Sequence, residues 1–322
     1  MKYISIAGLG KGCSQIIMGT SLFTPARKDE VFAILDAYVA NGGNTLDTSR
    51  IYSLGQSEEV LALWLKARGN RNRLNIVSKG CHHHVDADGR HHPDKVRVRP
   101  AIITQDMKES LGRMKVEHFD IYLLHRDDPA MPVGELIDRL EEHRRAGLIR
   151  AYGVSNWSTA RMEAANAYAA AKGYPAIAVN SPSFSLARIN EPRWQGCTYA
   201  DDAYISWHAR ARLPLFSWAS QASGFFTGGY SPENCPNPDI ARVYYSDGNW
   251  ERKRRAAALA AQKGGSYTAN HVALAYVLCQ PFPVGAVIGP QKADELLDSL
   301  TAVGLSLGER EMAWLDLRLD TL

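Results

Sequence analysis

The sequence predicts a single (β/α)8 barrel, also called a TIM barrel, that spans residues 1–322, and two observations lead to it. An apolar strand followed by a helix recurs eight times without a break in composition. Polar or ionisable side chains also stand at the ends of four of these strands, where barrel enzymes place their chemistry. A length of 322 residues suits one large α/β barrel, and 45% hydrophobic residues with 22% charged residues is an ordinary globular balance.

The first half of the chain supplies four of the strand–helix units. The first strand, Gln15–Thr20, precedes a helix over Glu30–Ala40 whose apolar residues recur at helical spacing. The next three units are a strand ending at Asp47 with a helix over Ser57–Arg68, a strand over Leu74–Lys79 with a helix over Ile102–Met114, and a strand over Phe119–His125 with a helix over Val133–Ala146.

The second half supplies the other four. They are Ala151–Ser155 with a helix over Thr159–Ala171, Ala176–Asn180 with a weaker helix, Leu213–Trp218 with a helix over His271–Leu278 after a long connection, and Val284–Ile288 with a helix over Ala293–Leu300. Residues Glu309–Leu319 indicate one extra C-terminal helix. The glycines of Gly8–Gly12 precede the first strand, so they indicate an N-terminal β-hairpin and not a dinucleotide fingerprint, which argues against an open doubly wound sheet.

Charge and cysteine content narrow the class of protein. The net charge is only +3 and is not gathered into runs, so neither nucleic acid nor an anionic membrane is expected as the main partner. No segment has the apolar length of a membrane span, and the first residues do not resemble a signal peptide. The five cysteines are scattered without Cys-x-x-Cys spacing, which favours reduced thiols and a cytoplasmic location. The oligomeric state is left undetermined.

The strand ends bring one chemically coherent set together. Asp47, Lys79 and His125 end three strands, and Tyr52 follows Asp47 in the next loop. A phenol titrates near pH ~10, so a neighbouring ammonium is expected to lower its pKa, and a carboxylate keeps that ammonium charged. An imidazole can orient a carbonyl whose oxygen gains charge in the transition state. Such a set suits carbonyl reduction with Tyr52 as general acid, and the hydride then has to come from a cofactor.

Four segments at these strand ends resemble the aldo-keto reductases. They are GNTLDTSRIYS, NIVSKG, DIYLLHRDDP and AYGVSNW, they occur in the family's order, and the likeness runs from about Gln15 to the final helix. The resemblance implies that Asp47, Tyr52, Lys79 and His125 form the catalytic tetrad, and that Ser155 and Asn156 hold the nicotinamide carboxamide. It also implies an NAD(P)(H)-dependent enzyme acting on aldehydes, ketones or sugars.

The later segments resemble the family's cofactor-binding blocks less closely. In LFSWASQASGFFTG, Trp218 stands where a tyrosine usually stacks on the nicotinamide, and in VNSPSFSL, Ser181 replaces a common glutamine. In VIGPQKADELLDSL, Glu295 stands where NADPH-preferring relatives often carry arginine, which leaves Lys292 as the nearby cation. NADP(H) is favoured and NAD(H) stays possible. The expected cofactor contacts are Gly19, Thr20, Asp47, Ser155, Asn156, Trp218, Ala219, Gln221, Gly289, Gln291, Lys292, Glu295 and Ser299.

The substrate is expected to meet Tyr52 and His125, with Trp157 and Phe23 as apolar walls. Ser21 stands where many relatives have an aromatic, and little chain follows the last barrel helix. An open, polar mouth is therefore expected, one that accepts sugars or other polyhydroxylated carbonyls at least as well as bulky aromatic ketones or steroids. The alternative for the polar residues of this mouth is that Arg126 and Asp127 form a surface ion pair.

Each of these residues also has a purely structural interpretation. Asp47 could cap a turn, Tyr52 and Lys79 could be solvated, and Ser155–Asn156 could cap the following helix. For the histidine-rich segment Cys81–His92, a solvated loop is favoured over a metal site, because helical His-x-x-x-His spacing is missing. No metal is expected.

Two further alternatives concern other parts of the chain and other functions. Arg252–Arg255 is interpreted as a solvated helix face rather than a phosphate site. The other functional hypotheses are a cofactor-binding regulatory subunit on the same barrel and a metal-dependent barrel hydrolase.

Overall fold

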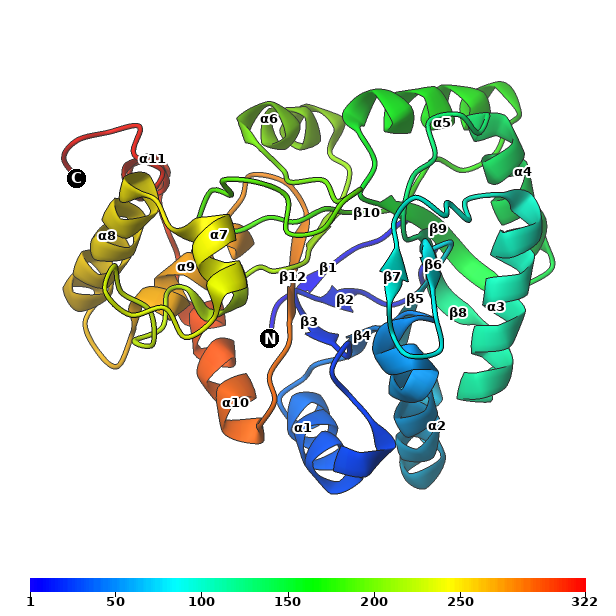
Figure 1. The fold of residues 1–322 in the computed structure, drawn as a ribbon, viewed down its shortest axis with the longest axis horizontal. Coiled ribbons are helices and arrows are strands. Elements are labelled where there is room, and N and C mark those ends of the chain that lie inside the picture. The colour runs from blue at the N-terminus through cyan, green and yellow to red at the C-terminus, as the bar shows by residue number, and fades with distance from the viewer.

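A closed barrel of eight parallel strands forms the centre of the protein, with helices around it (Figure 1). This computed structural model describes all residues from 1 to 322. The barrel strands are β3 (Ile16–Gly19), β4 (Thr45–Asp47), β5 (Asn75–Gly80), β8 (Phe119–Leu124), β9 (Ile149–Ser155), β10 (Asn180–Ser181), β11 (Leu215–Ser217) and β12 (Val284–Ile288). The ladder closes where Ala286 of β12 pairs with Ile16 of β3. The predicted (β/α)8 fold is confirmed.

Helices follow the barrel strands as the sequence predicts. They are α1 (Lys28–Ala40), α2 (Gln56–Arg68), α3 (Pro100–Met114), α4 (Val133–Arg145), α5 (Thr159–Ala171), α6 (Asp202–Ala211), α9 (Ala269–Leu278) and α10 (Ala293–Thr301). Two more, α7 (Pro238–Tyr244) and α8 (Asp247–Lys263), lie in the long connection after β11, and α11 (Glu309–Leu315) ends the series. Short 3-10 turns occupy Pro25–Arg27, Tyr52–Gly55, Arg71–Arg73, Ala222–Gly224 and Ala302–Gly304.

The predicted N-terminal hairpin closes one end of the barrel. Strands β1 (Tyr3–Ile4) and β2 (Cys13–Ser14) pair antiparallel, with Gly8 at a φ of 85° in the turn between them. Ile6 and Cys13 belong to a cluster of ten buried apolar residues that fills the barrel interior, together with Val77 and Ile121. The hairpin therefore seals the end opposite the strand carboxyl termini.

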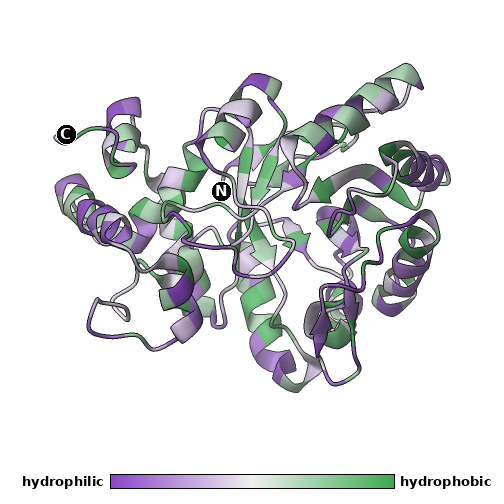
Figure 2. Ribbon diagram, turned by 45° about the horizontal axis from the view of Figure 1, so that its top comes forward, coloured by the Kyte–Doolittle hydropathy of each residue, from purple (hydrophilic) through white to green (hydrophobic).

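A second and larger apolar cluster lies between the barrel and its helices. It holds 67 buried residues and explains why the helices turn hydrophilic faces outward (Figure 2). Helix α9 is the extreme case, because all but its first residue are buried. Thr268 and His271 cap its first turn reciprocally. None of the helices is long and apolar enough to cross a bilayer.

Three expectations about individual segments need correction. The strand expected over Ala176–Asn180 is only Asn180–Ser181, and Pro182, which has no N–H to donate, follows it directly. The histidine-rich segment, expected as a solvated loop, contains a hairpin of β6 (His84–Val85) and β7 (His91–His92), and His82 and His83 before it are buried. The last helix ends at Leu315, four residues before the expected Leu319.

The basic run of α8 is only partly the solvated face that was expected, because Arg254 is exposed but its neighbours are partly or fully buried. Arg255 is only 8% exposed and donates hydrogen bonds to the carbonyls of Trp314 and Leu319, at 2.7 and 2.6 Å. Arg252 lies 3.7 Å from the carboxylate of Asp316. These arginines hold the C-terminal segment against α8.

Candidate active site

The carboxyl ends of three adjacent strands position Asp47, Lys79 and His125. Asp47 is the last residue of β4, Lys79 lies one residue before the end of β5, and His125 follows β8 directly. The backbone N–H of His125 donates to the carbonyl of Gly80 at 2.8 Å, so the ladder extends to the histidine itself. All three side chains are buried, with 3%, 3% and 7% of their surface exposed.

Tyr52 reaches the same place through a strained turn. The backbone N–H of Arg50 donates to the carbonyl of Lys79 at 3.2 Å, which ties the start of the loop to β5. Ser53 and Leu54 then take positive φ values of 47° and 56°. Only a few per cent of non-glycine residues adopt this backbone, and it costs roughly 1–2 kcal/mol per residue. The turn leaves the ring of Tyr52 edge-on to that of His125, with centroids 5.7 Å apart.

The ammonium of Lys79 connects Asp47 and Tyr52, and the ring of Tyr52 lies against that of His125. Nζ of Lys79 lies 2.5 Å from Oδ1 of Asp47, 3.1 Å from the hydroxyl of Tyr52 and 3.2 Å from the carbonyl oxygen of Thr48. These three partners use all three donors of the ammonium. The structure therefore brings together the four residues of the expected tetrad.

Burial changes the pKa values of Lys79 and Tyr52. Burial would lower the pKa of Lys79, but Asp47 and Tyr52 together raise it above its ordinary value, so the lysine stays charged. Burial raises the pKa of Tyr52, and Lys79 only partly opposes that effect. Lys79 does lower the pKa of Tyr52, as expected, but burial outweighs this effect and the net shift is upward. Tyr52 is a neutral phenol at neutral pH, ready to donate a proton.

His125 is held neutral, and a serine that the sequence reasoning missed contacts it. Burial lowers the pKa of His125 well below its ordinary value, and His82 and Arg126 lower it further. Its Nδ1 lies 3.0 Å from Oγ of Ser49, which also lies 3.1 Å from the carbonyl oxygen of Lys79. The available signal was the hydroxyl two residues after Asp47, on a loop that faces the mouth.

Ser155 and Asn156 lie beside this group. The amide of Asn156 donates to the carbonyl of His125 at 3.1 Å and to Oγ of Ser155 at 3.0 Å, while Ser155 donates to the carbonyl of Ser181 at 2.7 Å. Helix α5 is capped instead by Ser158, which accepts from the N–H of Arg161. The alternative role of Ser155–Asn156 as the cap of that helix is therefore excluded.

The remaining expected cofactor residues form a second group at β11, β12 and α10. Gln221 donates to Oγ of Ser299 at 3.1 Å, which ties the segment after Trp218 to α10. The carboxylate of Glu295 accepts from the N–H of Gln291 at 2.8 Å, so it caps the start of that helix. Lys292 is exposed there.

A second cation lies at the start of α10, which sequence reasoning missed. Arg27, 264 residues away in the chain, donates to the carbonyl of Gln291 at 2.7 Å, and it also pairs with Glu30. Lys292 is therefore not the only nearby cation.

Three expected contact residues prove to be packing residues. Phe23 and Trp157 belong to the larger apolar cluster with 2% and 0% of their surface exposed, so neither offers a wall to a substrate. The guanidinium of Arg161 covers the ring of Trp157 at 5.0 Å. Thr20 is fully buried and donates to the carbonyl of Asp47 at 3.0 Å, which fixes β4 rather than presenting a hydroxyl to a cofactor.

Gly19 is also required by close packing. It pairs with Asp47 across the β3–β4 ladder. A Cβ atom at this position would lie 2.8 Å from the carbonyl oxygen of Ile288 in β12, which is too close for any side chain. The glycine therefore allows β3 and β12 to approach where the barrel closes.

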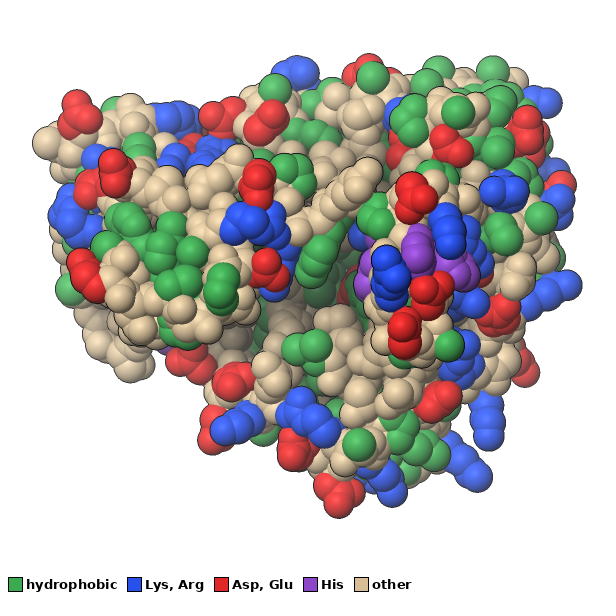
Figure 3. Space-filling model, in the orientation of Figure 1, with side chains coloured by type: hydrophobic (Ala, Val, Ile, Leu, Met, Phe, Trp, Pro, Cys, Tyr) green, Lys and Arg blue, Asp and Glu red, His purple; other side chains and the backbone are tan.

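The histidine hairpin lies against the tetrad instead of standing in solvent. His82 and His83 are only 6% and 7% exposed, and the ring of His82 lies 4.8 Å from that of His125. His83 Nε2 is 2.8 Å from Nδ1 of His91, and one nitrogen from each of these three histidines lies within 4.8 Å of the others. The purple patch in Figure 3 marks this hairpin at the rim of a groove that separates it from the lobe of α7 and α8.

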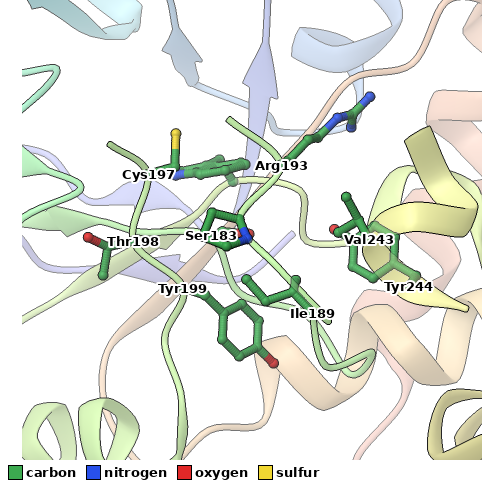
Figure 4. Close-up of a pocket in the computed structure, with 10 residues that line it drawn as sticks. Ser183, Ile189, Arg193, Cys197, Thr198, Tyr199, Val243 and Tyr244 are labelled. Atoms are coloured by element: carbon green, nitrogen blue, oxygen red, sulfur yellow. The ribbon is translucent and has the colours of Figure 1, made fainter. Parts of the chain in front are cut away.

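The other side of the mouth is built around Trp218. Its ring is half-buried and lies 5.8 Å from that of the exposed Trp194. A small pocket next to it is lined by residues of the 183–199 segment and of α7, and Figure 4 shows Ser183, Ile189 and Tyr199 gathered there. Both indole rings thus stand at the β11 side of the groove.

Comparisons with known proteins agree with this geometry. The model of the Aldo/keto reductase family matches residues 15–317. An aldo-keto reductase of Fusarium vanettenii is 25% identical over 325 residues, covering 93% of this chain and 84% of the relative. An uncharacterized oxidoreductase of Bacillus subtilis is 23% identical, covering 98% and 95%. Among solved structures, a glycerol dehydrogenase of Gluconobacter oxydans superposes with a TM-score of 0.79 at 23% identity, covering 98% of this chain and 94% of that one.

Proposed function

Because the chain belongs to the aldo/keto reductase family, we propose that it is an NAD(P)(H)-dependent carbonyl oxidoreductase in which Tyr52 is the general acid. One observation carries this proposal: Lys79 contacts both the hydroxyl of Tyr52 and the carboxylate of Asp47 inside a buried site. The reduced nicotinamide supplies the hydride when it is bound. The protein supplies the proton and the electrostatic stabilisation.

The proton moves from the hydroxyl of Tyr52 to the carbonyl oxygen as that oxygen gains negative charge. The positive charge of Lys79, 3.1 Å from the phenolic oxygen, stabilises the phenolate that remains. Asp47 holds the ammonium in place through the 2.5 Å contact. In the reverse direction the same phenolate accepts the proton from an alcohol.

His125 orients the carbonyl as a neutral hydrogen-bond donor. For Nε2 to carry the proton that faces a substrate, Nδ1 has to accept a hydrogen bond. Ser49 is placed to donate it at 3.0 Å. The same hydroxyl lies 3.1 Å from the carbonyl oxygen of Lys79, which competes for its single proton, so Ser49 acts as a positioning residue that selects this histidine tautomer when it donates to Nδ1.

The chain's own residues fit a dinucleotide cofactor. Oγ of Ser181 and Nε1 of Trp218 are buried without a hydrogen-bond partner, and open space adjoins Gly289. Ser181 pairs with Ser155 across the β9–β10 ladder, so its free hydroxyl adjoins the residues expected to hold the carboxamide. Ser155, Asn156 and Ser181 would hold that group, and Trp218 would stack on the ring.

The segment after Trp218 suits a pyrophosphate. Ala219, Ala222 and Ser223 have positive φ values between 47° and 53°. Left-handed residues in a turn direct successive backbone N–H groups toward one side, which forms an anion-binding concavity. Gln221, Gly289, Gln291 and Ser299 continue this strip toward the adenosine end at α10, where the helix N-terminus adds positive potential.

NADP(H) is favoured over NAD(H), by a small margin. Lys292 and Arg27, which already pairs with Glu30, bring two positive charges to the start of α10, and Glu295 and Asp294 bring two negative ones. Both acidic residues lie in the first turn of that helix. A 2′-phosphate therefore meets nearly balanced charges instead of a strongly positive pocket.

The His125 side of the mouth is polar, which favours small polyhydroxylated or otherwise polar carbonyl compounds over steroids, although two indole rings line the β11 side. Phe23 and Trp157 are buried in the core. The residues next to His125 are instead polar, namely Ser49, His82 and Arg126. The five free cysteines suit a reducing compartment such as the cytoplasm.

Turnover of a panel of aldehydes, ketones and aldoses with both reduced cofactors tests the function. Reduction of at least one compound that is lost in Tyr52→Phe is the expected result. Cofactor binding without any turnover would instead favour a regulatory subunit. Activity that requires an added metal and hydrolyses its substrate would favour a barrel hydrolase.

A further inference from the structure

A cavity of about 170 Å³ lies next to the two residues that follow His125, between the histidine hairpin and the segment before α6. Its lining comes from the hairpin and the chain after it, from the two residues that follow His125, and from the segment near Trp194, namely His83, Pro93, Val96, Arg97, Val98, Arg126, Asp127, Gln195 and Gly196. Blue basic side chains stand next to the purple histidines at this rim of the groove in Figure 3. The lining therefore contains two guanidinium groups and one carboxylate.

Two of these three charges are already neutralised within the protein. Arg97 pairs with the buried carboxylate of Asp106, at 2.7 Å. Asp127 pairs with Arg161 at 3.0 Å, not with Arg126 as the sequence suggested. Both groups are thus committed to structural ion pairs.

Arg126 is the exception. No carboxylate lies within 4.0 Å of its guanidinium, and its single hydrogen bond goes to the carbonyl of His125 at 3.0 Å. Its Nε is buried without any partner. Leaving a half-buried charged group with unused donors is costly unless a ligand completes it.

The surroundings of Arg126 keep its charge unopposed and its place fixed. Burial lowers the pKa of His82 to about 2 and that of His83 to about 4, so neither imidazole is charged near neutral pH. The indole N–H of Trp157 donates to the carbonyl of Arg126 at 3.2 Å, and Asn156 donates to that of His125. These hydrogen bonds therefore hold the backbone of Arg126 in place, one residue after the catalytic imidazole.

We propose that Arg126 binds an acidic group of the substrate, a carboxylate or a phosphate, while the carbonyl of the same molecule lies at Tyr52 and His125. A planar guanidinium matches the two oxygens of such a group and is the preferred partner for it. Gln195, in the same lining, offers a further side-chain amide donor. The preferred substrates are then short aldehydes or ketones that carry an anion near the carbonyl, not neutral sugars.

This inference rests on the proposed reductase activity for its substrate arm, so the experiment has a binding arm that does not. In the activity arm, kcat/KM is compared for two matched pairs, 4-oxobutanoate against butanal and glyceraldehyde 3-phosphate against glyceraldehyde. The native enzyme is expected to prefer at least one acidic member by tenfold or more. Whichever pair shows the larger ratio identifies the acid as carboxylate or phosphate.

Two variants and one control attribute that preference to Arg126. Arg126→Gln is expected to reduce the acidic-to-neutral ratio to about two or less, mainly through KM of the acidic compound. Arg126→Lys keeps the charge without the planar fork and is expected to fall between the two. Arg310→Gln removes an exposed arginine of α11, far along the chain from the mouth, and is expected to leave the ratio unchanged.

In the binding arm, malonate and inorganic phosphate are titrated by calorimetry into the native protein and the same variants. At least one of the two anions is expected to bind the native protein and Arg310→Gln, and to bind Arg126→Gln at least tenfold more weakly. Anion binding that depends on Arg126 in a protein that reduces no carbonyl would refute the reductase activity but keep the anion site. Reduction of neutral aldehydes, with no preference for acidic members and no Arg126-dependent anion binding, would overturn the inference and keep the reductase.

Discussion

Lys79 and Arg126 both bring a positive charge to the mouth of the barrel, but their surroundings differ. Each of the three donors of Lys79 contacts a protein oxygen, and a carboxylate 2.5 Å away balances its charge. Arg126 contacts one backbone carbonyl and faces no carboxylate. The tetrad is thus complete within the protein, which suits a fixed proton donor, whereas the region of Arg126 is incomplete, which suits recognition of a ligand.

Among substitutions in the tetrad, the one at Tyr52 is expected to have the largest effect on activity. Tyr52→Phe removes the proton donor and keeps the ring, so the reduction rate is expected to fall at least about a hundredfold. Cofactor affinity, measured by fluorescence titration, is expected to stay nearly unchanged. Comparable steady-state activity in the variant would remove Tyr52 from the mechanism.

The surroundings of Arg126 are expected to change how the free energy of unfolding depends on pH. One of these residues, His82, has a pKa of about 2 in the folded protein and about 6.5 in the unfolded chain. As pH falls below about 6.5, the unfolded chain takes up a proton that the folded protein does not. Stability is therefore lost toward low pH, by about 1.4 kcal/mol per pH unit from this one group.

His82→Asn removes that contribution. Urea unfolding between pH 6 and pH 4 is expected to show a shallower loss of stability in His82→Asn than in the native protein. His84→Asn, in an exposed position of the same hairpin, is the control and is expected to keep the native slope. His83, His91, His125 and the positive charge of Arg126 act on His82 in the native protein, and all four groups remain in each variant. Equal slopes in all three proteins would show that His82 is accessible to protons.

The hydrogen bond by which Ser49 positions His125 can be tested by substituting Ser49. Ser49→Ala removes the hydrogen bond to Nδ1 of His125, and a bond of ~1 kcal/mol corresponds to a fivefold to tenfold fall in kcat. Ser49→Thr keeps the hydroxyl and is expected to recover most of the rate. A fall in stability without a change in kcat would assign Ser49 a structural role only.

A smaller effect is expected at the adenosine end. Glu295→Gln keeps the side-chain oxygen that accepts from Gln291 but removes a negative charge beside the expected 2′-phosphate site. NADPH affinity is expected to rise roughly threefold, the scale of a partly screened charge, and NADH affinity to stay constant. Glu309→Gln on α11 serves as the control. A rise in affinity for both cofactors would mean that Glu295 acts through the helix rather than on the phosphate.

Metal chelation is expected to have no effect at all. Although His82, His83 and His91 cluster, His83 and His91 already contact each other, and Arg126 opposes a second cation beside them. Activity before and after treatment with EDTA measures this. Loss of turnover that zinc restores would turn the hairpin into a metal site.

The sequence alone predicted the barrel and the four residues that the structure brings together at its mouth. Strand–helix periodicity is a local pattern, and in a parallel barrel every strand ends at the same mouth. Asp47, Lys79 and His125 could therefore be placed together from their positions at strand ends. The N-terminal hairpin and the extra C-terminal helix follow from equally local signals, namely clustered glycines and helical periodicity.

Tertiary structure decided the state and the partners of each group. The pKa of Tyr52 depends on how far the folded chain excludes water, which no motif reveals, so the sequence predicted the lowering by Lys79 but not the larger opposing effect of burial. Trp157 and Phe23 are apolar in any context, and only packing shows that they face the core. Arg27 reaches Gln291 across 264 residues, and Asp127 takes Arg161 instead of its neighbour Arg126. Charge balance is a property of space rather than of chain order, because Coulomb energy depends on separation and burial.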